Sequence, residues 1–458
     1  MAWLSAAATW IDSAATALFM PWIVVLLFGS GLFLTIRYRV IQVVRFPEAV
    51  REVLGRASTD TKGALTPFQA FMTALAASIG TGNVAGVATA IISGGPGALF
   101  WIWCYGFVAM AIKLTEAVLG LRFRLATPHG ISSGPMYYLR DGLGSPALAW
   151  IYALVAGVAA LTTTPFTQPN SIADVIRAQV GVQPVVTGVI LAVLTWLVII
   201  GGLSQIGRVV ERLSPIKVGL YLAGGLIVIG SHAARLPEVF ALVLREAFST
   251  RAAVGSVAGV GMLVAIRYGL ARGIYANEAG YGTAAVAYGT AASREPVQQG
   301  LHAVLEVFIV SFVTSTISAL VLLVTGAWQS GEKGAGAVVV AFEAAMPGVG
   351  GWIVAFCVFL FGYTTLIGWA YYGEQFLEYL LGRRVSVPYR WIYCLLIPFG
   401  AASRVDAVWA WGDLMNALQV FPNMVGLIAL SGLVARLLAS SRGQVSARRS
   451  DRSPPAGA

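Results

Sequence analysis

The chain has 458 residues, of which 58% are hydrophobic and only 11% are charged. Soluble domains carry about 25% charged residues, so this composition excludes a large soluble core. The net charge of +10 does not indicate a nucleic-acid partner either, because the basic residues gather in alternate loops between apolar runs long enough to cross a bilayer.

These runs predict an all-α polytopic membrane protein with eleven transmembrane helices in a lipid bilayer. In chain order the helices cover residues 15–36, 66–93, 96–121, 149–178, 184–203, 216–231, 254–282, 297–328, 350–381, 389–403 and 408–439. Residues 132–144 are short and amphipathic, which indicates a segment at the membrane interface. Residues 331–347 indicate an external loop with a short helix.

The same segments predict one transmembrane domain over residues 1–440. Residues 15–36 form an extra N-terminal helix, residues 66–231 a first set of five helices, and residues 254–439 a second set. Residues 441–458 are polar and rich in Pro and Gly, which predicts a disordered cytoplasmic tail.

The basic residues predict the topology. They cluster between the first and second helices, after the third, before the sixth, after the ninth and in the tail; the sets include Arg37 to Lys62, Lys113 to Arg140, Arg208 to Lys217, Arg383 to Arg390 and Arg436 to Arg452. Cytoplasmic loops are enriched in Lys and Arg. We therefore expect the N-terminus outside and the C-terminus in the cytoplasm.

Two predicted helices are interrupted at membrane depth. One carries "SIGTGNVAG" from Ser78 to Gly86, and the other carries "ARGIYANEAGYG" from Ala271 to Gly282. Without the first helix ten remain, and these two segments head the two sets of five. Gly-interrupted helices at matching positions of two halves are typical of the binding site of a transporter.

Such breaks expose main-chain groups that can bind a ligand. Every backbone group in hydrocarbon must be paired, so an unwound stretch survives only where it is buried in protein or lines a cavity. The half-helix that follows the break offers N–H groups to a carboxylate. The half-helix that precedes it offers carbonyls to a cation. The pattern therefore predicts a site for a small zwitterion; the alternative reading of the glycines is close helix packing.

Four motifs carry a resemblance to a known family. "PFQAFMTALAASIGTGNVAGVATAIISGGPGALFWIW", "ARGIYANEAGYGTA", "WAYYGEQFLEYLLG" and "WGDLMNALQVFPNM" resemble the alanine or glycine:cation symporter family, also called amino acid carrier proteins. The resemblance covers residues 21–439. It implies a leucine-transporter-like five-plus-five inverted repeat, and symport of alanine or glycine with Na⁺, or less often H⁺, across a bacterial inner membrane. It implies neither an enzyme, nor an organic cofactor, nor an obligate protein partner.

The resemblance also implies roles for single residues at the substrate site. Thr81 and Gly82 would bind the carboxylate through their N–H groups, with Asn83 orienting it, and Trp369 would limit the substrate side chain to about a methyl group. The other expected substrate ligands are Gln168, Gly273, Tyr275 and Asn277.

A cation site is implied beside them. The carbonyls of Ala76 and Ile79 and the hydroxyls of Thr364 and Thr365 match the oxygen ligands of this fold, although threonines in a helix also bond to carbonyls of their own helix. Ionisable residues at membrane depth are functional candidates by default, and we expect gating or structural ion pairs at Arg272, Glu278, Glu306 and Glu374.

Two departures from the family pattern leave alternatives open. Thr164, Pro165 and Phe166 replace a usual Gly-Asn-Met stretch beside Gln168, which affects the expected substrate size. Val310 stands where an acidic residue is usual; either Glu306, one turn upstream, replaces it or the coupling ion differs. The alternative functions are an H⁺-coupled or exchange-type carrier of another small amino acid and, from another class, an ion channel, for which no filter-like repeat is present.

Overall fold

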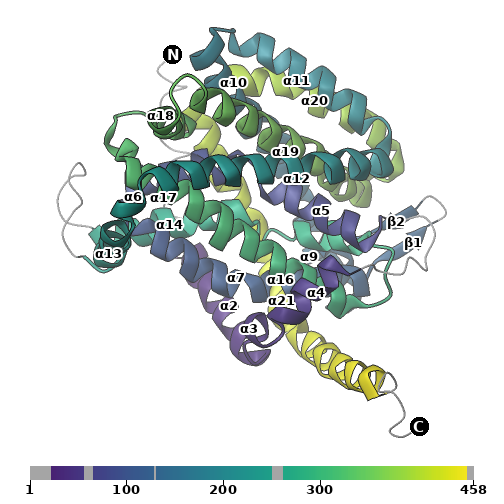
Figure 1. The fold of residues 1–458 in the computed structure, drawn as a ribbon. Helices are drawn as coiled ribbons and strands as arrows, with labels where there is room; N and C mark the ends of the chain where they lie inside the picture. Colours follow the sequence, from purple (N-terminus) through teal and green to yellow (C-terminus); the bar gives the residue numbers. More distant parts are fainter. Residues whose placement is uncertain (1–21, 56–64, 128–129, 250–260, 451–458) are drawn as a thin grey trace, which may run out of the picture.

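The structure, a computed structural model, describes residues 22–55, 65–127, 130–249 and 261–450. Helices make up nearly all of this part, with one two-stranded antiparallel sheet formed by β1 (Leu125–Thr127) and β2 (Gly130–Ser132) (Figure 1). The expected segments 15–21, 254–260 and 451–458 lie outside the described residues.

The helices follow the expected order with shifted boundaries. The first half contains α2 (Val24–Arg37), α3 (Ile41–Val44), α4 (Phe46–Leu54), α5 (Pro67–Ser78), α6 (Ala85–Gly94), α7 (Ala98–Arg122), α8 (Pro135–Tyr137), α9 (Pro146–Thr162), α10 (Thr164–Val180), α11 (Pro184–Ile199), α12 (Gly202–Ser231) and α13 (Leu236–Ala247). The second half contains α14 (Gly261–Asn277), α15 (Thr283–Gly289), α16 (Pro296–Phe308), α17 (Ser315–Thr325), α18 (Ala335–Ala345), α19 (Gly350–Leu381), α20 (Ser386–Ala402) and α21 (Val405–Ser450).

Fewer helices qualify as complete spans than the eleven expected. In the described residues, six helices are long and apolar enough to cross a membrane, or seven if α5 and α6 count as one bent span. Helices α2 and α11 have 14 and 16 residues, which is short of the 17 to 25 residues, roughly, that a span needs. The count of eleven therefore stays a prediction, while the helical fold with several apolar spans is confirmed.

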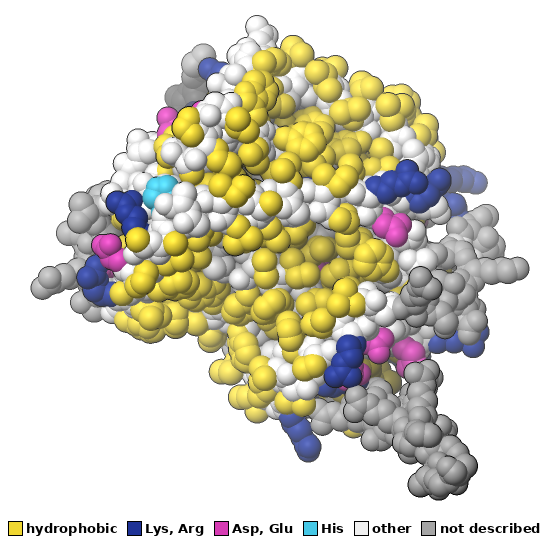
Figure 2. All heavy atoms as spheres, in the orientation of Figure 1, with side chains coloured by type: hydrophobic (Ala, Val, Ile, Leu, Met, Phe, Trp, Pro, Cys, Tyr) yellow, Lys and Arg dark blue, Asp and Glu magenta, His cyan; other side chains and the backbone are white. Residues whose placement is uncertain are grey.

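The surface is apolar over a broad area. Figure 2 shows hydrophobic side chains covering most of one face, with Arg and Lys side chains at its margins. Large exposed hydrophobic residues lie on α11 and α20, which pack side by side; they include Val189, Val193, Leu197, Trp391, Leu395 and Phe399. An exposed apolar surface of this extent indicates contact with lipid.

Three expectations about polar segments need correction. Lys113 and Lys217, assigned above to basic loops, lie inside α7 and α12 and are 1% and 0% exposed. Arg208 and Arg212 lie on α12, which begins at Gly202 instead of residue 216. Helix α21 continues to Ser450, into the stretch for which the composition predicts disorder.

Candidate functional site at two helix breaks

The first break separates α5 from α6, whose axes differ in direction by 58°. Helix α5 begins with a capping box in which Thr66 and Gln69 bond reciprocally, and it ends at Ser78. Beyond the break, Asn83 donates from Nδ2 to the Ser78 carbonyl at 2.8 Å, and Ser318 donates to the Asn83 carbonyl at 2.6 Å. Side chains thus replace the backbone bonds that the break removes.

The second break separates α14 from α15. Its backbone turns through positive φ angles at Glu278 (56°), Gly280 (97°) and Gly282 (86°). The buried Glu116 of α7 accepts the N–H groups of Gly280 and Gly282 on one oxygen, Oε1, at 2.9 and 3.0 Å. Asn423 of α21 donates to the same oxygen and to the Gly280 carbonyl. Glu116 therefore caps the break.

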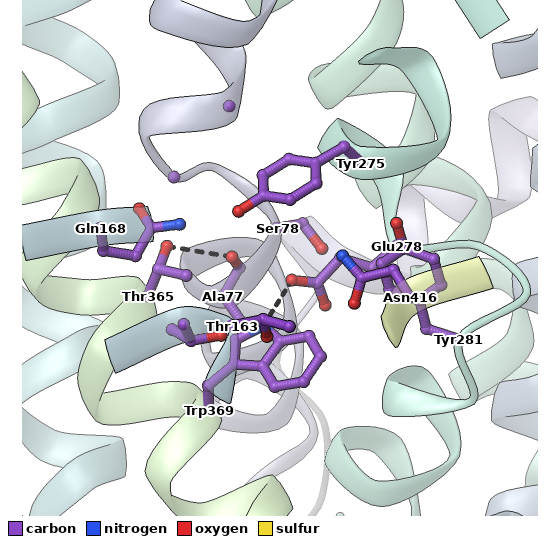
Figure 3. Close-up of a pocket in the computed structure, with 13 residues that line it drawn as sticks. Ala77, Ser78, Thr163, Gln168, Tyr275, Glu278, Tyr281, Thr365, Trp369 and Asn416 are labelled. Carbon is purple, nitrogen blue, oxygen red and sulfur yellow. Dashed lines mark hydrogen bonds between the residues drawn. The ribbon is translucent and has the colours of Figure 1, made fainter. Parts of the chain in front are cut away.

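A small cavity lies between the two breaks (Figure 3). The volume that the centre of a water-sized sphere can occupy is ≈ 20 Å³, which is about enough for one water molecule. Gln168 and Thr365 lie on one side, Glu278 and Asn416 on the other, and the Tyr275 ring lies between them at one end. An amino acid needs more room, so a substrate would have to displace side chains that now fill the site.

The structure brings only part of the expected substrate set together. Gly82, Gln168, Tyr275 and Trp369 line the cavity.

The remaining expected residues lie in the surrounding shell. Asn83 and Asn277 are fully buried. Asn83 Oδ1 accepts a hydrogen bond from Ser315 of α17, and Asn277 Oδ1 accepts one from Ser311 of helix η5 (Ile309–Thr314). Gly273 packs against Tyr105 of α7, where an added Cβ would meet the ring at 3.2 Å. Asn83, Gly273 and Asn277 therefore pack around the breaks, and in this structure they do not line the cavity.

Gln168 occupies the position expected for a substrate carboxylate. Its Oε1 accepts from the Thr81 N–H at 3.1 Å and from the Thr81 hydroxyl at 2.9 Å. The Thr81 N–H is one of the two donors that the family resemblance assigns to the carboxylate, the other being the Gly82 N–H. A carboxylate that binds there must displace the Gln168 oxygen.

The four residues expected to hold the cation also converge. Thr365 donates to the carbonyls of Ala76 and Ala77 at 3.1 and 3.0 Å, and Thr364 lies beside the Ala76 carbonyl. The structure places the ammonium of Lys217 among them: its Nζ donates to the carbonyl of Ile79 at 2.7 Å, to that of Ala76 at 3.1 Å and to Thr364 Oγ1 at 2.5 Å.

A second buried lysine lies next to the other break. Lys113 Nζ contacts Glu306 Oε1 at 2.6 Å, the Asn277 carbonyl at 2.6 Å and Ser78 Oγ at 2.8 Å. Glu306 also accepts from Ser78 and from Tyr288. One ion pair thus joins α7, α16 and the ends of α5 and α14.

The other ionisable candidates have different partners. Arg272 of α14 pairs with Asp413 of α21 at 2.8 Å, and Glu374 of α19 makes a bidentate pair with Arg390 of α20 at 2.7 Å. Glu278 forms no ion pair in the described part of the chain, so that expectation is corrected. It accepts instead from Trp369 Nε1 at 2.6 Å and from Thr283 at 2.9 Å, and it lines the cavity.

A larger cavity lies beyond the Arg272–Asp413 pair. This vestibule measures ≈ 500 Å³ and lies between α6, α10, α14 and α21; its polar lining residues include Thr89, Asp174, Arg267, Arg272, Lys333 and Asp413. Tyr275 and Trp409 pack against each other between the two cavities, with ring centroids 4.9 Å apart and ring planes inclined by 51°. A thin layer of side chains thus separates the vestibule from the central cavity.

Sequence reasoning missed several residues of the site. Asn416 and Thr163 line the cavity, and Lys217 and Glu116 bond the broken backbone. The sequence does contain a signal for Lys217: it is the single charged residue in the apolar run "SPIKVGLYLAGG", which indicates a lysine inside a membrane helix and not in a loop. For Asn416 and Thr163 only the folded packing brings the side chains to the cavity.

Comparison with known proteins agrees with this architecture. The family model described as "Sodium:alanine symporter family" matches residues 4–453. The sodium/alanine symporter AgcS of Methanococcus maripaludis is 37% identical over 424 residues, covering 90% of this chain and 92% of that protein. The probable sodium/glutamine symporter GlnT of Bacillus subtilis is 31% identical over 416 residues, covering 90% and 86%.

Solved structures share the fold at low identity. A manganese transporter of Eremococcus coleocola superimposes with a TM-score of 0.52 at 15% identity, covering 81% of this chain and 77% of that one. A Na⁺-coupled sialic acid symporter gives a TM-score of 0.50 at 13% identity, covering 90% and 85%. At this identity the likeness shows the fold alone.

Proposed function

Because this chain belongs to the sodium:alanine symporter family, we propose that it imports a small neutral amino acid, alanine or glycine, by cation-coupled symport with alternating access. The chain is an integral membrane transporter and not an enzyme. The observation that carries the proposal is the small cavity between two helix breaks, with amide and hydroxyl groups on one wall and a carboxylate on the other.

The walls of the cavity suit the two charges of an amino acid. On one side the Thr81 N–H and hydroxyl donate to Gln168 Oε1, and a substrate carboxylate would take that oxygen's place at the start of the second half-helix. On the opposite side Glu278 offers a carboxylate to the substrate ammonium. The carboxylate and the ammonium are closest together in an α-amino acid, which suits two walls that face each other across so small a cavity.

Trp369 supports a substrate with a small side chain. It lines the cavity, is 3% exposed, and is held by its hydrogen bond to Glu278. A held indole ring leaves little room for a side chain larger than methyl. Its bond to Glu278 also couples this wall to the group that would bind the ammonium.

The layer between the two cavities would act as a gate. We infer that the vestibule faces outwards and that the Arg272–Asp413 pair and Tyr275 separate it from the central cavity in this conformation. Opening would require this pair to part and Tyr275 to leave Thr167, to which it donates at 2.9 Å. The basic loops support a cytoplasmic C-terminus, and the proposed location is a bacterial inner membrane, as the family resemblance implies.

Na⁺ is the first coupling ion to test, since the family description and the AgcS name contain sodium. An H⁺-coupled or exchange-type carrier is the second candidate, favoured by the position of Lys217 on the expected cation ligands.

Uptake into proteoliposomes tests the function. Vesicles that hold the full chain should accumulate labelled alanine or glycine above equilibrium when an inward Na⁺ gradient is imposed, and collapse of the gradient should abolish accumulation. An inward H⁺ gradient without Na⁺ and internal alanine without any gradient test the second candidate. Absence of alanine and glycine transport under all three conditions would reject the proposal.

The size of the cavity makes Gly80 sensitive to substitution. A Cβ at residue 80 would meet Thr365 Oγ1 at 2.6 Å and Gln168 Oε1 at 3.1 Å, so Gly80→Ala would push both side chains into the cavity. We expect alanine affinity to fall at least about tenfold, which corresponds to about 1.4 kcal/mol. Equilibrium binding of labelled alanine to the purified protein measures this.

Gly230→Ala is the matched control for this change, because no atom lies within 4 Å of its added Cβ. An unchanged alanine affinity in Gly80→Ala, with Gly230→Ala also unchanged, would mean that the substrate does not bind in this cavity.

A further inference from the structure

We propose that Lys217 is a built-in cation that fills the expected cation site, so that no Na⁺ ion binds among the oxygens of Ala76, Ile79 and Thr364. The inference deepens the proposed function, since it concerns how the cation site of that same transporter is filled. It is carried by the geometry around one nitrogen atom.

Lys217 Nζ uses all of its donors on these oxygens. An ammonium has three N–H groups and no acceptor. The three acceptors of Lys217 are the carbonyls of Ile79 and Ala76 and the hydroxyl of Thr364, at 2.7, 3.1 and 2.5 Å. Three oxygens from two helices thus point at the same nitrogen. A metal cation that used the same oxygens would need the volume that Nζ already fills.

The groups around Lys217 Nζ are neutral. Lys217 is 0% exposed and, in the part of the chain that the structure describes, forms no ion pair. Its carbonyl acceptors lie at the C-terminal end of α5, which is the negative end of a helix dipole. The Phe361 ring lies 5.3 Å from Nζ and adds a cation–π contact. These features are what a cation site offers to a free ion.

Lys113 shows how a structural lysine differs. Lys113 of α7 donates to a carbonyl at the end of α14, just as Lys217 of α12 donates to carbonyls at the end of α5. The ammonium of Lys113, however, also contacts the Glu306 carboxylate at 2.6 Å. Its charge is therefore neutralised within the protein. The charge of Lys217 is balanced only by dipoles, as that of a bound Na⁺ would be among neutral oxygens.

The Lys217 nitrogen is covalently attached to α12 and, unlike a free ion, cannot leave the site. Lys217 lies well inside α12, a helix of 30 residues. Its side chain links α12 to α5 and α19. A free ion would leave the site and let the end of α5 part from Thr364 of α19. With the lysine in place, this contact holds whether or not an ion gradient exists. Any Na⁺ that drives transport must then bind to other oxygens.

Na⁺-dependent thermal stability tests the inference without any amino acid. The full chain is purified in detergent, and its unfolding midpoint is measured in NaCl and in choline chloride at equal ionic strength. Lys217→Ala removes the charge and leaves room for an ion, whereas Lys217→Met removes the charge and fills the space. We expect Na⁺ to raise the midpoint of Lys217→Ala by several degrees more than that of the wild type or of Lys217→Met.

Thr364→Val identifies the site in each background. Combined with Lys217→Ala it should remove the gain from Na⁺, while in the wild-type background it should leave the Na⁺ response unchanged. A wild-type Na⁺ response that Thr364→Val abolishes would overturn the inference, as would equal Na⁺ responses of the wild type and both Lys217 variants. If Lys217→Ala does not fold, the comparison of wild type with Thr364→Val decides alone.

The outcome is independent of the test for transport. A chain that moves neither alanine nor glycine in proteoliposomes contradicts the proposed function, yet its Na⁺ titration still reports whether the ion competes with Lys217. A chain that transports alanine with Na⁺, but whose Na⁺ response disappears in Thr364→Val, keeps the function and loses the inference.

Discussion

Lys113→Met is expected to destabilise the protein by about 3–5 kcal/mol, because it leaves the Glu306 carboxylate buried without its counter-ion. Both side chains are almost completely buried, at 1% and 0% exposure. The substitution also removes the donor to the Asn277 carbonyl at the end of α14 and to Ser78 at the end of α5. The free energy of unfolding in detergent, or the yield of monodisperse protein, measures the loss.

The double variant Lys113→Met with Glu306→Gln separates charge from packing. It has no buried unpaired charge, so we expect it to recover a large part of the lost stability, since replacing both members of a buried pair costs less than breaking it. The matched control is Arg140→Met, which breaks an ion pair with Asp141 whose side chains are 35% and 38% exposed; exposed pairs contribute at most about 1 kcal/mol. A double variant no more stable than Lys113→Met would show that the charge is not the cause.

The position of the two breaks could be predicted from sequence because it depends on local chemistry. Gly80, Gly82, Gly280 and Gly282 interrupt apolar runs, and the structure ends α5 and α14 just before them. Two of these glycines, Gly280 and Gly282, have positive φ, a conformation that favours glycine. The family resemblance, confirmed by the match over residues 4–453, added the arrangement of the helices.

The partners of the broken backbone could not be predicted in the same way. Glu116 and Lys217 are far in sequence from the groups that they bind, at separations of 164 and 138 residues for Gly280 and Ile79. A lysine near a run of arginines has the composition of a cytoplasmic loop, and only the length of α12, which begins at Gly202, carries Lys217 into the core. The enrichment of Lys and Arg in cytoplasmic loops predicts which side of the membrane a segment faces, but it does not predict how deeply a single lysine is buried.

The same limit explains why the cavity lining differs from the expected set. The sequence motif identifies a broken helix, but it does not identify which of its side chains face the cavity. Asn83 and Asn277 form hydrogen bonds with groups around the breaks and not with the cavity. Glu278, the residue after Asn277, faces the cavity because its φ of 56° turns the chain. A left-handed residue at that position cannot be read from composition.

Replacement of Glu116 should have an effect of similar size, because one side chain caps the whole second break. Glu116→Ala removes the acceptor of two buried N–H groups and one partner of Asn423. Each buried N–H without a partner costs about 1–3 kcal/mol. We therefore expect a loss of stability of about 2–6 kcal/mol and, because Glu278 and Tyr275 stand on this break, a fall in alanine affinity. Thermal unfolding and alanine binding measure the two effects.

Glu116→Gln is the informative control, because it keeps one oxygen. A single atom, Oε1, accepts all three hydrogen bonds, and Oε2 has no partner among the described residues. The amide oxygen can take over the role of Oε1, and the amide nitrogen would occupy the position of the unpartnered oxygen. Glu116→Gln should therefore keep most of the stability and the affinity that Glu116→Ala loses. If both variants lost stability equally, the charge of Glu116, and not its oxygen, would hold the break, and the account of the second half-helix as a structure capped by hydrogen bonds would be wrong.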